Sequence, residues 1–275
     1  MQNINELIGK HDILFVTLDT LRYDVAQECW AKGRTPNLAS VLPTTGWEKR
    51  HSPATFTYAA HHAFFAGFLP TPEAPGRHPR LFATRFAGSE TTTESTCVLD
   101  APDIVTGLAE HDYHTVCIGG VGFFNKLNPL GRVLPCLFEE SHWSEELGVT
   151  NQQSTANQVV VAQRILEALP AHQRVFLFLN ISAIHQPNRF YLDGAVKDSL
   201  LSHTAALEYV DAHLGSLFRI MQKRAPILGI ICSDHGTAYG EDNYHGHRLA
   251  HPVVWEVPYA DFVLPKVNPL GHHEH

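Results

Sequence analysis

Short apolar runs that stop abruptly at polar residues recur along this chain. The four clearest runs are Ile13–Leu18, His114–Ile118, Val175–Leu179 and Ile227–Cys232. Runs of this length, without alternating polar positions, are typical of strands buried on both faces of a parallel sheet. A fifth run, Val257–Leu264, has Pro258 near its start. Because proline lacks the N–H that a central strand needs, we predict that this strand closes the sheet at an edge.

Segments with helical periodicity separate these runs. The longer ones are Ala101–Glu110, Asn151–Leu169 and Ser199–Arg224. Two shorter helices are predicted from capping signals: Thr35 begins one that continues to about Leu42, and Thr57 caps another that stops at Gly67. The alternation of strands and helices predicts an α/β fold, a mostly parallel sheet sandwiched by helices.

Three stretches lack periodicity. Pro70–Thr96 is predicted to be loop, Val121–Gly148 to be irregular and to cover the mouth of a site, and Thr237–His251 to be a polar loop rich in histidine. There is no internal repeat and no linker. We therefore predict a single domain over residues 1–275, with a polar tail at 266–275.

Composition narrows the class of partner. The formal net charge is −8 and no Lys/Arg run is present, which argues against nucleic acid. No segment approaches the roughly 20 apolar residues of a membrane span, so we expect no membrane partner. The N-terminus lacks the features of a signal peptide, and the five cysteines show no CxxC spacing. These features predict a reducing, cytoplasmic location, with Cys117 and Cys232 in the core.

Acidic residues follow two of the predicted strands. Asp19 comes directly after the first strand, and Asp234 and His235 follow the run that ends at Cys232. Ligands of open α/β sheets bind outside the carboxyl ends of the strands, where these side chains would meet. Either aspartate alone could be a turn former or helix cap, but a cap does not explain the pair. Carboxylate and imidazole ligands suit Mn²⁺ or Zn²⁺, so the sequence predicts a metal site here.

Thr57 is the candidate nucleophile. It stands at the predicted start of a helix, where free backbone N–H groups favour negative charge. A hydroxyl at such a position can attack an anionic ester that the helix end helps to hold. The alternative is that Thr57 only caps the helix.

Four blocks in order resemble the alkaline phosphatase and sulfatase superfamily, over about Asp12 to Pro265. They read ILFVTLDTLRYD, TPNLASVLPTTGWEKRHSPATFTYAAHHAFFAG, FLFLNISAIHQP and ICSDHGTAYGEDNYHGHRLAHPVVWEVPYADFVLP. The resemblance implies an alkaline phosphatase-like fold. It also implies one divalent metal ion, Mn²⁺ or Zn²⁺ ahead of Ca²⁺ or Mg²⁺. The ligands carried over by the resemblance are Asp19, Thr57, Asp234 and His235.

The same resemblance assigns the nucleophile. Thr57 lies ten residues before Gly67, which is the spacing of the family's nucleophile. The neighbouring hydroxyl residues Ser52 and Thr55 do not have this spacing. His61, one helical turn after Thr57, matches the position where sulfatases place an arginine that orients the nucleophile.

The resemblance also assigns two histidines to the substrate. It implies that His185 contacts non-bridging oxygens of the ester and that His247 assists the leaving group, a role suited to a pKa near 7. His245 and His251 are alternatives to His247.

Departures from the family pattern limit the chemistry. No cysteine stands at the nucleophile position, which argues against sulfatase activity. Ile181 replaces the aspartate of two-metal members, and neutral residues around Gly119 replace a lysine-bearing block. We expect a compact domain without the C-terminal subdomain of typical sulfatases. What remains resembles the one-metal branch with a threonine nucleophile.

The predicted function is therefore metal-dependent hydrolysis of small anionic phosphate or phosphonate esters, through a phospho-threonine at Thr57. Two alternatives remain. One is a phospho- or sulfo-transferase that acts on a small molecule or peptide. The other is a non-catalytic, metal-binding member of the family.

Overall fold

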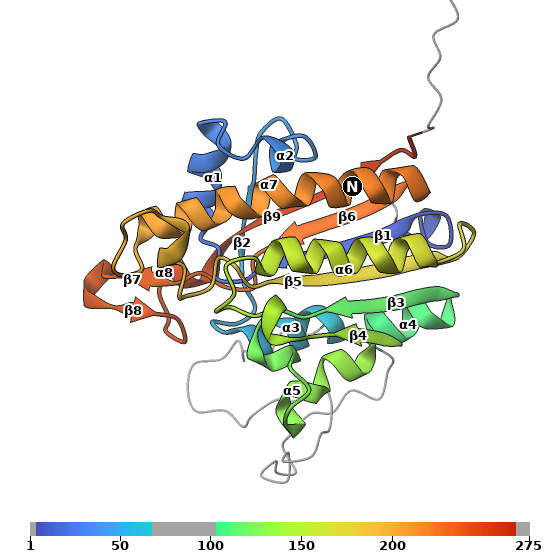
Figure 1. The fold of residues 1–275 in the computed structure, drawn as a ribbon, viewed down its shortest axis with the longest axis horizontal. Coiled ribbons are helices and arrows are strands. Elements are labelled where there is room, and N and C mark those ends of the chain that lie inside the picture. The colour runs from blue at the N-terminus through green and yellow to red at the C-terminus, as the bar shows by residue number, and fades with distance from the viewer. Residues whose placement is uncertain (1–3, 68–102, 268–275) are drawn as a thin grey trace, which may run out of the picture.

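A seven-stranded sheet forms the centre of the protein, in the order β2-β9-β6-β1-β5-β3-β4 (Figure 1). The computed structural model describes residues 4–67 and 103–267. The strands of this sheet are β1 (Asp12–Leu18), β2 (Glu48–His51), β3 (Tyr113–Ile118), β4 (Glu140–His142), β5 (Arg174–Ile181), β6 (Ile227–Cys232) and β9 (Glu256–Leu264). Strands β6, β1, β5, β3 and β4 are parallel, whereas β9 and β2 run antiparallel to their neighbours. A separate hairpin pairs β7 (Ala238–Tyr239) with β8 (His245–Gly246).

Helices of very different length connect the strands. The α-helices are α1 (Tyr23–Ala31), α2 (Pro36–Ala39), α3 (Thr57–Ala66), α4 (Ile104–Glu110), α5 (Pro129–Val133), α6 (Ser154–Ala168), α7 (Leu200–Arg224) and α8 (Pro252–Trp255). The single-turn 3₁₀ helices are η1 (Ile4–Glu6), η2 (Gly122–Phe124), η3 (Pro135–Leu137), η4 (Glu145–Leu147), η5 (Arg189–Tyr191) and η6 (Glu241–Asn243). None of the described helices has the length and apolar character needed to span a membrane.

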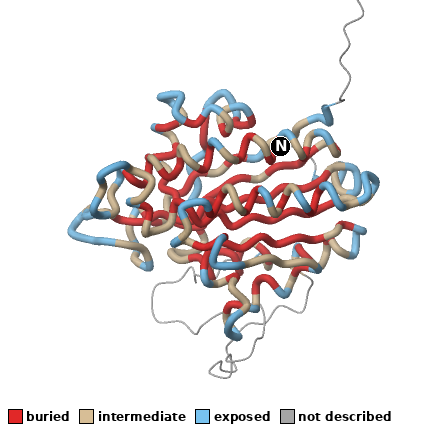
Figure 2. Tube along the Cα trace, viewed as in Figure 1, coloured by how far each residue is buried: buried red, intermediate tan, exposed pale blue. Residues whose placement is uncertain are grey.

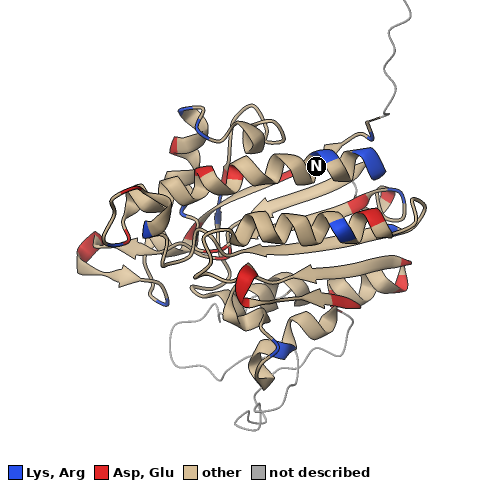
Figure 3. Cartoon of the chain, in the orientation of Figure 1, with Lys and Arg blue, Asp and Glu red and all other residues tan. Residues whose placement is uncertain are grey.

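Each face of the sheet has its own hydrophobic core. Leu14 and Val16 of β1 pack with α1, α2, α6 and α7, while Ile13 and Phe15 pack with α3 and α4 on the opposite face. Alternate residues of a strand point to opposite faces, so one unbroken apolar run supplies both cores. Figure 2 shows the strands buried along most of their length, and Figure 3 shows charged residues mainly outside the central strands. The predicted sheet, covered by helices on both faces, is confirmed.

The position of β9 corrects one prediction. This strand is internal, because the charged and exposed strand β2 pairs beyond it, with Lys49 opposite Pro258. The carbonyl of Pro258 accepts a hydrogen bond from the Ser233 N–H, just past the last residue of β6. In an antiparallel pair, the nitrogen and carbonyl of one residue face the same side. The nitrogen of Pro258 therefore faces Ser233, beyond the last residue of β6. The missing N–H thus removes no hydrogen bond from within the pairing of β6 with β9.

Two other regions differ from the predicted arrangement. Helix α1 was not predicted, and Val121–Gly148 contains α5 and the edge strand β4 in place of irregular chain alone. Helix α1 buries only Val25, Ala26 and Cys29 among polar neighbours, and β4 is three polar residues, none of them fully buried, so neither has a strong hydrophobic pattern. The predicted loop Pro70–Thr96 and the tail from residue 268 lie outside the described residues.

Candidate metal and nucleophile site

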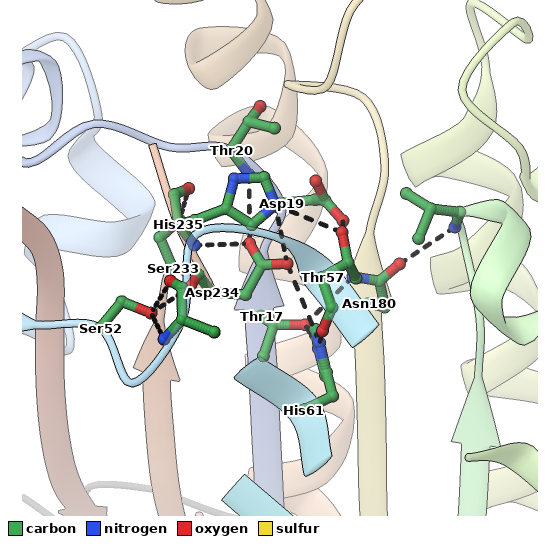
Figure 4. A network of polar contacts seen from close by, with 12 residues as sticks. Thr17, Asp19, Thr20, Ser52, Thr57, His61, Asn180, Ser233, Asp234 and His235 are labelled. Carbon is green, nitrogen blue, oxygen red and sulfur yellow. Dashed lines mark hydrogen bonds and ion pairs between the residues drawn. The ribbon is translucent and has the colours of Figure 1, made fainter. Parts of the chain in front are cut away.

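The residues predicted to hold a metal ion come together at the carboxyl edge of the sheet. Strands β1 and β6 are adjacent and parallel, with Thr17 opposite Cys232, so the acids that follow them emerge side by side. Helix α3 begins over the same edge, where Thr57 faces both acids (Figure 4). Asp19, Thr57, Asp234 and His235 therefore meet, although they come from three separate parts of the sequence.

Asp234 is held by one of its two carboxylate oxygens. Its Oδ1 accepts hydrogen bonds from the backbone N–H groups of Thr20, at 3.2 Å, and His235, at 3.0 Å. Thr20 has a φ of 65°, which is unusual for a β-branched residue and typical of strained functional sites. The other oxygen, Oδ2, is buried without a hydrogen-bond partner among the described residues.

Asp19 shows the same division of roles. Its Oδ2 accepts hydrogen bonds from Nδ2 of Asn180, at 3.3 Å, and from the hydroxyl of Thr57, at 3.4 Å. Its Oδ1 is buried and, among the described residues, has no partner. Each aspartate therefore leaves one fixed oxygen available to a cation.

His235 contributes a ring nitrogen to this cluster. Its Nδ1–H donates to the carbonyl of Gly236, at 2.9 Å, which leaves the lone pair on Nε2. That Nε2 lies 3.5 Å from Oδ2 of Asp234 and 3.3 Å from the Thr57 hydroxyl. A histidine that binds a metal through one ring nitrogen usually donates the N–H of its other ring nitrogen to a carbonyl or carboxylate, which fixes the ring orientation.

These residues fit a divalent cation. One atom each from Asp19, Asp234 and His235 lies within 4.8 Å of the others. Burial and the mutual repulsion of the two carboxylates raise the pKa of Asp19 to about 6, and burial raises the pKa of Asp234 to about 7. Two carboxylates buried this close together need a cation or bound protons to offset their repulsion. Carboxylate and hydroxyl oxygens together with one imidazole nitrogen are suitable ligands for Zn²⁺ or Mn²⁺.

Thr57 is not the N-cap of its helix, which corrects the capping interpretation. Phe56 occupies the N-cap position, and Thr57 is the first helical residue. Its hydroxyl is therefore free to face Asp19 and His235. The competing hydroxyl of Ser52 lies within hydrogen-bond distance of the Ala54 and Asp234 carbonyls. The Thr55 carbonyl accepts from the backbone N–H of Arg248, and the Thr55 hydroxyl has no hydrogen bond to another described residue.

His61 supports the nucleophile from beneath. It is fully buried, and its Nδ1–H donates to the carbonyl of Thr57, at 2.7 Å. Its Nε2 accepts from the hydroxyl of Thr17, at 3.0 Å. Burial lowers the pKa of His61 to about 3, so the ring is neutral. A neutral ring that links β1 to the start of α3 can orient Thr57 but cannot replace the charge of an arginine.

A pocket of about 340 Å³ opens above Thr57. Thr57, His185, His247 and Arg248 line one part of it. Residues of the Val121–Gly148 stretch, as expected, line the rest together with Val149. The ring centroid of His247 lies 5.6 Å from that of His185 and 4.5 Å from that of His235. Both predicted substrate histidines therefore reach the site.

The two alternatives to His247 do not line this pocket. His245 is exposed on β8. His251 caps α8 and lies 3.1 Å from Asp242. Burial lowers the pKa of His247 to about 3, well under the value near 7 expected for its role. In the free site His247 is thus neutral, and it could donate a proton only after an anionic ester had raised its pKa.

Asn180 was missed by the sequence analysis. It is fully buried at the end of β5 and donates to both Asp19 and Thr17. Its Oδ1 accepts from the N–H of Val121, which ties the pocket wall to the metal site. The signal was present, because Asn180 is a polar residue that follows a buried run, as Asp19 and Asp234 do.

Comparison with known proteins places the fold. No family model and no curated protein sequence matches the chain. The C-terminal periplasmic domain of EcEptC from Escherichia coli, in complex with Zn, matches with a TM-score of 0.64 at 12% identity, over 94% of this chain and 75% of that one. The lipoteichoic acid synthase LtaP from Listeria monocytogenes matches with a TM-score of 0.60 at 13% identity, over 97% and 67%. A protein in the alkaline phosphatase superfamily from Vibrio parahaemolyticus matches with a TM-score of 0.57 at 17% identity, over 95% and 62%.

These neighbours overturn one prediction and confirm another. The cytoplasmic location is wrong, because similar structures such as the EptC domains are periplasmic. Unpaired cysteines were a poor guide to the compartment, since thiols buried in a core, such as Cys117 and Cys232, are protected wherever the protein resides. The family expectation from the sequence motifs, in contrast, is confirmed at the level of the fold: this chain has the fold of the alkaline phosphatase superfamily.

Proposed function

We propose that this protein is a metal-dependent enzyme that moves a phosphoryl-type group from an ester to an alcohol acceptor, through a covalent bond to Thr57. The observation that carries the proposal is the position of the Thr57 hydroxyl, 3.4 Å from Asp19 Oδ2 and 3.3 Å from His235 Nε2. The hydroxyl thus lies against the cluster that fits a cation and faces the substrate-sized pocket.

In the proposed mechanism, Asp19, Thr57, Asp234 and His235 would hold a metal ion, Zn²⁺ in preference to Mn²⁺. When bound, this ion would lower the pKa of the Thr57 hydroxyl and offset negative charge on the group being transferred. Oγ1 of Thr57 releases its proton to solvent and forms a bond to phosphorus as the bond to the leaving oxygen breaks. His61 keeps the first turn of α3 in place by its bond to the Thr57 carbonyl.

The other pocket residues act on the ester itself. His185 contacts non-bridging oxygens, and His247 supplies a proton to the leaving oxygen once the anionic ester has raised its pKa. In a second step, the hydroxyl of an acceptor gives its proton to His247 and forms a bond to phosphorus as the bond to Oγ1 of Thr57 breaks. The released Thr57 oxygen regains a proton from solvent. Fixed donors around a water-poor site provide most of the acceleration in reactions of this type.

Transfer to an alcohol is preferred over the hydrolysis that the sequence alone favoured. The similar structures include phosphoethanolamine transferases and a lipoteichoic acid synthase. Transfer and hydrolysis share the first step and differ only in whether an alcohol or water attacks the phospho-threonine. Sulfuryl transfer is less consistent with the site, because a threonine replaces the family's modified cysteine.

Replacement of Thr57 tests the proposal. We expect Thr57→Ala to lower turnover of aryl phosphodiesters by roughly 10³-fold or more, and Thr57→Ser to retain part of it. Mass spectrometry of the wild type, quenched during turnover, should show the transferred group on the peptide that contains Thr57. An active Thr57→Ala protein would rule out the covalent mechanism.

Product analysis with an added alcohol separates the two fates of the intermediate. A transferase should form the new ester in proportion to the alcohol, whereas a hydrolase should release only the free acid. Metal binding without turnover of any phosphorus ester would instead favour the non-catalytic alternative.

A further inference from the structure

Two asparagines of the pocket lining carry amide NH₂ groups that have no acceptor among the described residues. Asn125 uses its Oδ1 to accept from the N–H of Leu127, at 2.9 Å. Asn128 uses its Oδ1 to accept from the N–H of Gly131, at 2.8 Å. Both residues line the pocket, and no hydrogen bond of either Nδ2 group to another described residue is seen. These bonds fix the orientation of both amides and leave only the NH₂ groups for a ligand.

Arg248 adds the permanent charge of this pocket. It lines the pocket mouth, is exposed, and forms no ion pair with any described residue. Its backbone is fixed in an unusual conformation, with a φ of 69° and an N–H that donates to the Thr55 carbonyl, at 2.9 Å. The guanidinium lies 5.9 Å from the centre of the Phe56 ring, next to the nucleophile.

The charged side chain in the lining of this pocket, Arg248, is positive. Among the described residues, no aspartate or glutamate lines this pocket, so an ammonium group in it would meet Arg248 and no countercharge. Phe123, Leu130 and Val149 add an apolar surface. Thr57 is only 3% exposed and lies at the floor, whereas Arg248 is at the rim. A ligand that touches both must therefore extend beyond the group that Thr57 attacks.

We propose that Asn125, Asn128 and Arg248 form a second anion subsite. It binds a carboxylate or a second phosphate carried by the substrate on the far side of the bond that is cleaved. This inference rests on the proposed function, which supplies the first phosphorus group at Thr57. The substrate class is thus a phosphorus ester whose remaining part is itself anionic and carries a small apolar segment. Donor-only groups and a guanidinium match the acceptor-only oxygens of such an anion.

Binding of three matched esters to the Thr57→Ala protein tests the subsite without turnover. The probes are phenyl phosphate, 4-carboxyphenyl phosphate and 4-(aminomethyl)phenyl phosphate, measured by calorimetry in the presence of Zn²⁺. We expect the carboxylated ester to bind about tenfold more tightly than phenyl phosphate, and the ammonium ester to bind most weakly. Arg248→Ala in this background should abolish the preference while changing the affinity for phenyl phosphate less than twofold.

Three further variants distinguish an effect of the subsite from an effect of backbone strain or of the overall charge of the protein. Asn128→Asp keeps a side-chain oxygen for the Gly131 N–H but replaces the free NH₂ by a carboxylate, so it should weaken the carboxylated ester and favour the ammonium ester. Arg248→Asn removes the guanidinium but tolerates the left-handed backbone, so it should behave as Arg248→Ala does. Arg164→Ala removes an exposed charge from α6 and should change nothing.

Equal loss of affinity for all three esters in Arg248→Ala would overturn the subsite, because Arg248 would then contact the attacked phosphorus group. Equal affinity of the three esters for the starting protein would also overturn it. Neither result bears on Thr57. Failure of the proposed function would appear separately, as undiminished turnover in the Thr57→Ala protein.

Discussion

Asn180 donates a hydrogen bond to Asp19, with its Nδ2 3.3 Å from Oδ2 of the carboxylate. The two residues stand at the ends of neighbouring parallel strands, β5 and β1. The bond occupies one oxygen of Asp19 and aims the other at the cluster with Asp234 and His235. We therefore propose that Asn180 positions Asp19 as a metal ligand.

Replacement of Asn180 by leucine should weaken metal binding. We expect the affinity for Zn²⁺, measured by competition with a chelating dye, to fall about 10–100-fold, the usual effect of losing a partner of a metal ligand. Asn157→Leu is the matched control, because the side chain of Asn157 bonds, within the described part of the chain, to the Glu146 carbonyl alone. An unchanged affinity in a folded Asn180→Leu protein would show that Asp19 does not depend on this bond.

Metal binding should also stabilise the fold. Zn²⁺ at a hundred times its dissociation constant is expected to raise the free energy of unfolding by about 2.7 kcal/mol. Asp234→Asn keeps Oδ1 for the Thr20 and His235 N–H groups but replaces the free oxygen, so most of the increase should vanish. The exposed Asp193→Asn should retain it. Thermal unfolding with and without Zn²⁺ makes the comparison, and a full increase in Asp234→Asn would exclude Asp234 as a ligand.

His203 should make stability depend on pH. It is fully buried between the backbone N–H of Arg22 and the hydroxyl of Tyr239, and burial lowers its pKa to about 3 from 6.5. Between these values the unfolded chain binds the extra proton, so this contribution to stability is complete above pH 6.5. It is lost as the pH falls from 6.5 towards 3.

The variant that isolates this effect is His203→Gln. From pH 6.5 to 4.5, the wild type should lose up to about 1.4 kcal/mol per pH unit more than the variant in denaturant unfolding. The exposed His245→Gln should follow the wild-type curve. Parallel curves for wild type and His203→Gln would show that His203 does not carry the pH dependence.

Arg224 should matter for stability and not for the site. Its Nε lies 3.0 Å from Oδ2 of Asp12, a fully buried carboxylate that also lies 3.2 Å from Arg174. Arg224→Ala should cost about 3 kcal/mol, because it leaves that carboxylate underpaired. Arg219→Ala, an exposed change on the same helix, should cost under about 0.5 kcal/mol. Because Asp12 begins β1 and Asp19 follows its other end, the affinity for Zn²⁺ should change less than twofold; a larger change would reveal coupling along the strand.

Much of the site could be predicted because its residues obey a local rule. Asp19 and Asp234 each follow an unbroken apolar run, and parallel strands bring such ends to one edge. The same rule applied to β5 would have found Asn180. The sheet was predicted equally well where strands are buried, as in β1 and β6. Strand β2 was not predicted, because its residues are charged and exposed and give no hydrophobic signal. It is a strand because it pairs with β9.

The sequence by itself determined the apolar runs, their helices and the chemical identity of the cluster around Thr57. Tertiary structure alone decided which atoms are free. Oδ1 of Asp19 is available because side chains from other elements, Asn180 and Thr57, engage its Oδ2. Oδ2 of Asp234 and the NH₂ groups of Asn125 and Asn128 are available because backbone N–H groups engage the other atom of each side chain. The burial that lowers the pKa of His247 likewise depends on the assembled pocket. Hydrogen bonding and desolvation depend on distances across the fold, which hydrophobic periodicity does not encode.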